Sequence, residues 1–193
     1  MIIDNGGSDG GFKAKVGVDG KLAVRGVEES EALDANKAGE AYNINTGIIS
    51  LTDAVETPVL YFKNNEANDF IIEAVVIAIW DSAAGDGADM VATFIRNPTA
   101  GTIVTSENNV SIVSNRNYGS SNSLTADAYV GATGNTMTDG DDHILVRVTE
   151  SSRNFIAINE VLPKGTSFGV KLTPPTSNNA MNCYVAIVGY VQQ

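Results

Sequence analysis

Hydrophobic and polar residues alternate with a period of two along most of this chain, and clusters of Gly, Asn and Pro separate the alternating runs. This pattern is typical of β-strands that turn one face to a core and the other to solvent. The sequence predicts strands over 46–51, 57–65, 69–81, 89–98, 101–106, 110–114, 125–130, 143–150, 153–163, 167–175 and 181–191. Of these runs, 153–163 fits either one strand or two.

The longest apolar run is FIIEAVVIAIW, from Phe70 to Trp80. Its enrichment in Ile and Val favours a strand over a helix. Glu73 interrupts the run, which with 11 residues is too short to span a bilayer. The sequence therefore predicts that this is the most buried strand of the fold, and that Trp80 at its end lies in the core.

The spacing of the predicted strands points to the fold class. They follow one another at intervals of about 8–14 residues, with turn residues and no helical runs between them, which is typical of an antiparallel sandwich or barrel. The sequence therefore predicts an all-β protein with an antiparallel β-sandwich. A jelly-roll layout is preferred, and an immunoglobulin-like layout stays open because both have this strand spacing.

Residues 12–27, FKAKVGVDGKLAVRGV, alternate around Asp19-Gly20, which is a two-residue hairpin signal. A two-stranded hairpin is not stable alone in water, so we expect it to pack either on the main body or on another subunit. Its apolar positions are the candidate partner-binding residues. These are Phe12, Val16, Val18, Leu22 and Val24.

The acidic, Ala-rich stretch from Glu28 to Asn43 fits one or two helical turns or an extended strap. Steady strand signals begin only after it. The sequence therefore predicts two parts, an N-terminal arm over residues 1–44 with a small hairpin and an acidic strap, and a jelly-roll-like β-sandwich domain over residues 45–193.

The charge balance narrows the choice of partners. The chain has 12 Lys and Arg against 23 Asp and Glu, a formal net charge of −11. This balance argues against binding to nucleic acid and to anionic membranes, both of which need a basic surface. It suits a partner with a basic surface.

The one cysteine, Cys183, excludes an intrachain disulfide. It lies in an apolar run, which predicts a buried thiol.

No group of residues predicts a catalytic, metal or cofactor site. The one histidine, His143, follows an Asp-rich turn, but the sequence lacks the G-x-S-x-G elbow of a Ser–His–Asp hydrolase, so a structural or surface role is predicted. The stretches 139–142 and 81–89 have the carboxylates and glycines that calcium prefers. Neither matches the EF-hand pattern, and solvated turns are predicted for both.

The stretch SNRNYGSSNSLTADAYVGATGNT, residues 114–136, is rich in Asn, Ser and Gly. Its short polar side chains can make many hydrogen bonds at a small cost in side-chain entropy. We expect it to face either solvent or a sister subunit. Tyr118 and Tyr129 are its candidate platform for stacking on a sugar.

Several motifs together resemble a group of small virion proteins from tailed bacteriophages, over nearly the full length of the chain. They are VDGKLAVRGVEE, AGEAYNINTGIISLT, LYFKNNE, IRNPTAGTIV, SNRNYGSSNSLTADAYVGATGNT and VLPKGTSFGVKLTPPT. The resemblance implies a non-enzymatic cement or decoration protein, made in the host cytoplasm and placed on the outer capsid surface of the virion. The implied partners are the major capsid protein and copies of itself, as a homotrimer or a dimer. A tail or baseplate component, or a host-glycan-binding sandwich module, is the alternative.

Overall fold

The computed structural model describes residues 30–81, 89–106, 111–150, 153–176 and 181–192, together with two short strands before them. The chain divides into two compact units, residues 1–30 and residues 31–193. In the first unit, β1 (Lys15–Val16) pairs with β2 (Leu22–Ala23) in antiparallel fashion, with Val16 opposite Leu22. A two-residue loop at Asp19-Gly20 would instead set Val16 opposite Ala23, and the residues of the loop lie outside the described part of the chain. The side chains of the five candidate partner-binding residues lie outside the described part of the chain.

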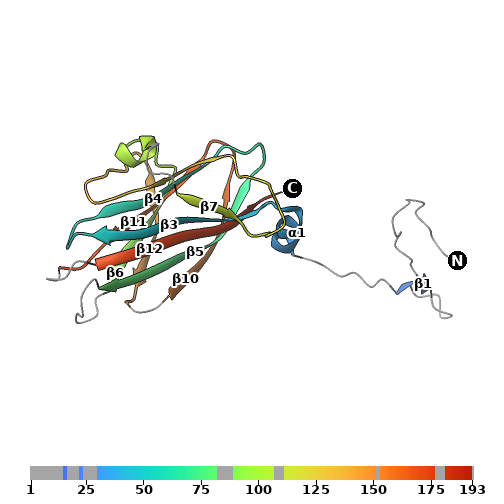
Figure 1. Cartoon of the computed structure of the whole chain (residues 1–193), viewed down its shortest axis with the longest axis horizontal. Helices are drawn as coiled ribbons and strands as arrows, with labels where there is room; N and C mark the ends of the chain where they lie inside the picture. Colours follow the sequence, from blue (N-terminus) through green and yellow to red (C-terminus); the bar gives the residue numbers. More distant parts are fainter. Residues whose placement is uncertain are drawn as a thin grey trace. The chain divides into compact units, whose positions relative to one another are not determined.

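The second unit is nearly all-β, with two antiparallel sheets of five strands each (Figure 1). One sheet, called the β5 sheet, has the order β10-β5-β12-β3-β7, and the other, called the β11 sheet, has the order β8-β4-β11-β6-β9. The strands are β3 (Ala41–Leu51), β4 (Thr57–Asn64), β5 (Phe70–Asp81), β6 (Met90–Arg96), β7 (Ile112–Asn115), β8 (Ala126–Val130), β9 (Asp141–Val148), β10 (Arg153–Leu162), β11 (Ser167–Thr173) and β12 (Met181–Val191).

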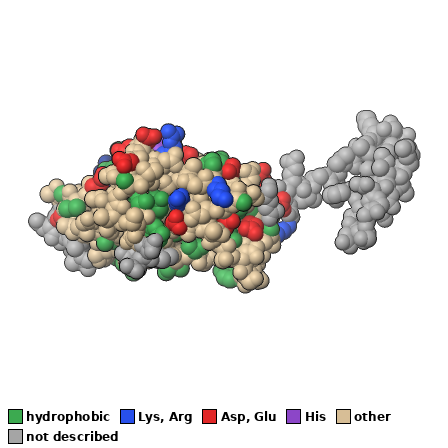
Figure 2. All heavy atoms as spheres, turned by 90° about the horizontal axis from the view of Figure 1, so that it is seen from above, with side chains coloured by type: hydrophobic (Ala, Val, Ile, Leu, Met, Phe, Trp, Pro, Cys, Tyr) green, Lys and Arg blue, Asp and Glu red, His purple; other side chains and the backbone are tan. Residues whose placement is uncertain are grey.

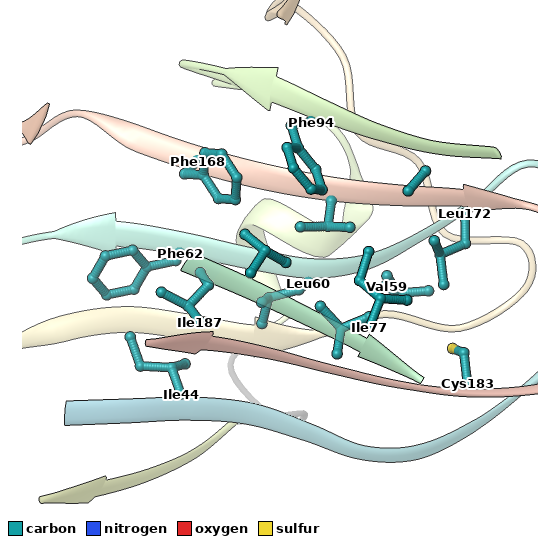
Figure 3. Packing of buried hydrophobic residues seen from close by; sticks show 14 of the residues in the cluster. Ile44, Val59, Leu60, Phe62, Ile77, Phe94, Phe168, Leu172, Cys183 and Ile187 are labelled. Atoms are coloured by element: carbon teal, nitrogen blue, oxygen red, sulfur yellow. The ribbon is translucent and has the colours of Figure 1, made fainter. Parts of the chain in front are cut away.

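One hydrophobic core lies between the two sheets, as expected for a β-sandwich-like fold. Figure 3 shows side chains from strands of both sheets converging on it. The β11 sheet contributes Phe94 and Phe168, whose ring centroids lie 5.6 Å apart. The β5 sheet contributes branched aliphatic residues such as Ile77 and Ile187, both fully buried. Each such side chain stabilises the fold by about 1.5–3 kcal/mol through loss of apolar surface from water.

Ten of the eleven predicted runs contain strands, and the run 101–106 was wrongly predicted as one. There the chain forms the 3₁₀ helix η1 (Thr102–Thr105). Its apolar residue Ile103 is fully buried, against the outer side of the β11 sheet with Tyr61 and Ile95. A run of four residues can bury one large side chain in either conformation, so its apolar character does not distinguish a strand from a helical turn.

The run 153–163 forms one strand, β10, with a shift of register between Ala157 and Glu160. Asn159 in this interval has a φ of 52°, in the left-handed region. The shift is a bulge that lets β10 continue beside β5 over its whole length.

The acidic stretch forms the two-turn helix α1 (Glu31–Ala38), and β3 begins at Ala41. Ala41 and Tyr42 are buried and pair with Tyr190 and Gly189 of β12. The expected boundary between residues 44 and 45 therefore falls inside β3, whereas the two compact units meet between residues 30 and 31. Neither of the described helices, α1 and η1, is long and apolar enough to span a bilayer.

The prediction that Trp80 lies in the core is wrong. In β5 the core takes the alternate residues Val75, Ile77 and Ile79, so the next residue, Trp80, points to the outer side and is partly exposed. The prediction of a buried thiol is confirmed, because Cys183 is fully buried in the core cluster.

Candidate functional site at the α1 junction

The helix α1 is the element through which the first unit of the chain joins the second. It packs beside the end of β12, where Ala35 is buried together with Ala41 and Tyr190. The small side chain of alanine lets the helix axis approach the strand closely. The Tyr190 hydroxyl donates a hydrogen bond to Glu31 Oε2 at 3.4 Å, which ties the first turn of the helix to the sheet.

The chain leaves α1 through a left-handed glycine. Gly39 has a φ of 77°, and the Glu40 amide donates to the carbonyl oxygen of Ala35 at 2.7 Å. A glycine in this conformation is the usual end of a helix because a side chain there would be strained. A Cβ atom at Gly39 would also overlap the Ser120 hydroxyl, so the Asn-rich segment lies directly against this turn.

Three asparagines of that segment cap the C-terminal end of α1. The last carbonyl groups of a helix lack intrahelical partners, and an amide side chain can donate to them. Part of the stretch 114–136 is therefore used inside the unit, a role that its composition did not indicate. The bonds run from Asn115 Nδ2 to Gly39 O (2.7 Å), from Asn117 Nδ2 to Lys37 O (3.1 Å), and from Asn122 Nδ2 to Ala38 O (3.2 Å) and Glu40 Oε1 (3.0 Å).

The same segment holds an aromatic side chain in solvent. Asn115 Oδ1 accepts from the Asn117 amide at 2.8 Å, and Asn117 Oδ1 accepts from the Gly119 amide at 3.0 Å. Between these bonds Tyr118 is fully exposed. Tyr129, the second candidate for stacking on a sugar, lies instead on the Tyr61 ring, with centroids 5.9 Å apart and planes 11° apart.

An ion pair fixes the start of the segment to the β5 sheet. Arg116 Nη1 lies 2.6 Å from Glu73 Oε2, and both side chains are about 70% buried, with 29% and 28% of their surface exposed. The Arg116 amide also donates to Ala41 O at 2.8 Å. A charge-assisted contact at this distance is stronger than a surface ion pair because water screens it less.

Several carboxylates lie around α1 and the end of β12. One cavity of about 220 Å³ is lined by Glu31, Asp34 and residues near the end of β12, and a second of about 400 Å³ is lined by Glu40, Glu66 and Gln192 among others. Burial, together with the charge of Glu40, raises the pKa of Tyr42 to about 12. Acidic side chains also occur in several groups on the face seen in Figure 2. This end of the unit offers negative charge and hydrogen-bond acceptors to a partner.

His143 lies at the open edge between the two sheets. Its Nε2 is 2.8 Å from Glu160 Oε1, which joins β9 to β10, the edge strands of the β11 and β5 sheets. Ser167 lines the same cavity of about 70 Å³, but its hydroxyl donates to Pro98 O at 2.8 Å. The arrangement stabilises the edge and does not orient the serine toward the histidine.

The Asp-rich turns hold ion pairs in the described part of the chain. Asp141 lies 3.4 Å from Arg96, and Asp89 lies 2.6 Å from Arg147 Nε. Among the residues that the structure describes, no three His, Cys, Asp or Glu side chains are grouped to hold a metal ion. Residues 82–88 of this stretch lie outside the described part of the chain.

Cys183 cannot act as a nucleophile at neutral pH. Burial raises the pKa of its thiol to about 12 because the thiolate would lose its hydration in the core. Its role is to fill space between the sheets.

Comparison with known proteins gives no family. No protein-family model matches the chain, and no curated protein matches it significantly.

Proposed function

We propose that this protein is a non-enzymatic structural protein of a bacteriophage virion, and that it acts as a capsid cement protein. The sheet unit lies on the outer surface of the shell, and the N-terminal unit holds the major capsid protein or a neighbouring copy. The observation that carries the proposal is the α1 junction, where a separate N-terminal unit is tied to the sheet unit by a capped and packed helix. The sequence resemblance supplies the phage context.

The junction suits a protein that must resist pulling. A load on the N-terminal unit that is carried along the chain reaches the sheets through α1, so the helix must neither unwind nor detach. Packing of Ala35 on Tyr190 opposes detachment, and the asparagine caps oppose unwinding from the C-terminal end. Each of these hydrogen bonds contributes about 0.5–1.5 kcal/mol to stability.

We further propose that the sheet unit is a jelly roll. In the order of the β5 sheet, β10-β5-β12-β3 lie together, and in the order of the β11 sheet, β4-β11-β6-β9 lie together. Four pairs of consecutive strands therefore have one strand in each sheet. These pairs are β3 and β4, β5 and β6, β9 and β10, and β11 and β12. This arrangement supports an eight-stranded jelly roll to which β7 and β8 add one edge strand each.

Charge supports a partner with a basic surface. Residues 31–193 contain 18 Asp and Glu against 8 Lys and Arg, so their formal net charge is −10. Opposite charge speeds the encounter of two surfaces and favours the correct orientation. A shell that presents many equivalent sites adds avidity, because several modest contacts made by one oligomer act together.

A host-glycan-binding module of a tail or baseplate is the second candidate, and the exposed ring of Tyr118 favours it. A sugar site also needs polar groups beside the ring to bind hydroxyls. The amides of Asn115, Asn117 and Asn122 already donate to the helix end, so they are not free for that purpose.

Co-sedimentation with phage shells that lack the protein tests the cement function. The intact chain should sediment with the shells. The double variant Val16→Glu, Leu22→Glu, which changes two paired residues of the hairpin, should stay folded by circular dichroism and lose binding. Tyr118→Ser is the matched control, and it should bind shells as the intact chain does. Binding by the hairpin variant would contradict the clamp, and glycan-array binding that Tyr118→Ser removes would favour the second candidate.

A further inference from the structure

The outer face of the β5 sheet, whose strands follow one another as β7, β3, β12, β5 and β10 in Figure 1, exposes large apolar side chains on β7, β3 and β10. They are Ile112, Ile48 and Phe155, and we call the area around them the bare face. Residues of β5 alternate, with Val75 and Ile77 in the core, so Val76 and Ala78 belong to the outer side. Neither of these two residues is a member of a core cluster, although Val76 is only 1% exposed.

Strand register places large exposed side chains at both ends of one row. The row runs across the whole sheet as Phe155, Val76, Ala186, Asn45 and Ile112. Its end members are 64% exposed (Phe155) and 59% exposed (Ile112), whereas Val76 and Ala186 in its middle are 1% and 5% exposed. The accessible apolar surface of this row therefore lies at its two ends.

The adjacent row also has an exposed apolar side chain at one end. It runs as Arg153, Ala78, Tyr184 and Ile48, and Ile48 is 73% exposed. Arg153 is the one charged residue in the two rows. Exposed faces of antiparallel sheets normally carry polar side chains, and β-branched and aromatic residues at successive exposed positions mark surfaces that become covered.

We propose that a second copy of this chain covers the bare face. A partner with a basic surface would be recognised by carboxylates, and the two rows have none. Copies of an acidic unit repel one another wherever their carboxylates meet, so their contact is most favourable where charge is absent. Glu73, a carboxylate of β5 outside the two rows, is already paired with Arg116.

The size of the face fits this occupant. Five strands spaced by about 4.8 Å are about 24 Å wide, and β12 from Met181 to Val188 is about 27 Å long. The resulting area of about 650 Å² is close to the roughly 800 Å² that each partner buries in a specific interface. Two such faces can stack about 10 Å apart, as the sheets of a sandwich do.

This inference deepens the oligomeric contacts of the proposed function, yet its test needs no shell. Sedimentation equilibrium of the full chain over a range of concentrations should give a mass above that of one copy. The double variant Ile48→Glu, Phe155→Glu should raise the dissociation constant by about 100-fold or more, because it brings carboxylates together in the interface. Both positions are exposed within one copy, so the variant should fold as the unchanged chain does.

Leu145→Glu is the matched control, because Leu145 is 66% exposed on β9 of the other sheet. It should associate like the unchanged chain. A full chain that stays monomeric would overturn the inference, and so would an Ile48→Glu, Phe155→Glu variant that associates normally. A monomeric chain that associates once Val16→Glu and Leu22→Glu are introduced would show that the hairpin covers the face instead. An unchanged chain that associates as expected but does not bind shells would count against the cement function alone.

Discussion

The outer faces of the two sheets differ in what lies on them. On the β11 sheet, η1 and the loop before β9 bring Ile103 and Met137 onto Tyr61 and Ile95, and all four side chains are buried. On the β5 sheet, Ile48 and Phe155 remain 73% and 64% exposed. Both faces contain apolar residues, and both are covered in part: α1 packs on Ile71 and Tyr190 of the β5 sheet, while Leu145 of the β11 sheet stays 66% exposed. The β5 sheet leaves three large apolar side chains exposed, those of Ile48, Ile112 and Phe155, and such a surface is the better candidate for a contact with another molecule.

Glycines at the β11 sheet make this covering possible. A Cβ atom at Gly169 would overlap the thioether of Met137, and one at Gly131 would overlap the carbonyl oxygen of Pro58. The covering segments thus approach the strands more closely than any larger residue would allow. On the outer face of the β5 sheet there are instead large side chains, those of Trp80, Tyr184 and Phe155.

Replacing one isoleucine on each face gives the largest expected difference. Ile103→Ala should destabilise the fold by about 3 kcal/mol, because it leaves a cavity under η1. Ile48→Ala should change stability by less than about 0.5 kcal/mol, because that side chain is mostly in water. Urea unfolding at low protein concentration, where copies are separate, measures both. Equal losses at the two sites would contradict the contrast between the faces.

A second comparison uses glycines. Gly131→Ala should cost about 2 kcal/mol or more, since the new methyl group meets backbone that cannot move aside. Gly47→Ala in β3 should cost about 1 kcal/mol, because the space around it is open and only its φ of 68° is unfavourable. Thermal unfolding of the two variants side by side is the measurement. A smaller loss at Gly131 would mean that the loop does not press on the β11 sheet as described.

A third test concerns the segment between β7 and β8. These two strands lie at the edges of the β5 sheet and the β11 sheet. Asn115→Asp keeps the acceptor for the Asn117 amide but replaces the donor to Gly39 O. It should destabilise the protein by about 1–2 kcal/mol, because a carboxylate then faces the negative end of α1. Denaturant unfolding and the rate of proteolysis near α1 report the loss. Asn122→Asp, at a more exposed cap, should lose less.

The smallest effect is expected at alkaline pH. Burial raises the pKa of Tyr61, on the covered face, above its ordinary value of 10.0, so the folded state favours the neutral phenol. That contribution is complete below pH 10 and is lost as the pH rises through the folded-state pKa. Tyr61→Phe should therefore flatten the decline of stability above pH 10 and leave stability at pH 7 almost unchanged. If the stability of Tyr61→Phe declines above pH 10 as steeply as that of the unchanged chain, then Tyr61 has the same pKa in the folded and the unfolded state.

Local patterns predicted much of the fold. The alternation in residues 57–65 and 143–150 depends only on neighbouring side chains and locates β4 and β9 closely. The same rule failed for residues 101–106, because one buried side chain decides that segment. It also misplaced Trp80, because the position of a residue relative to the core depends on the phase of the strand, and not on the apolar character of the run.

The sequence by itself determined that this protein consists of antiparallel strands with one core, that Cys183 is buried, and that the surface is acidic. These properties follow from side-chain periodicity and from counts of residues. Only the tertiary structure decided that asparagines of the segment 114–136 cap a helix at residues 31–38, and that Ile103 and Met137 cover Tyr61 on one sheet while Ile48 and Phe155 stay exposed on the other. The cap joins residues about 80 positions apart, as from Asn117 to Lys37, and the faces depend on strand order. A local pattern contains neither kind of information, because both arise from which distant segments fold against one another.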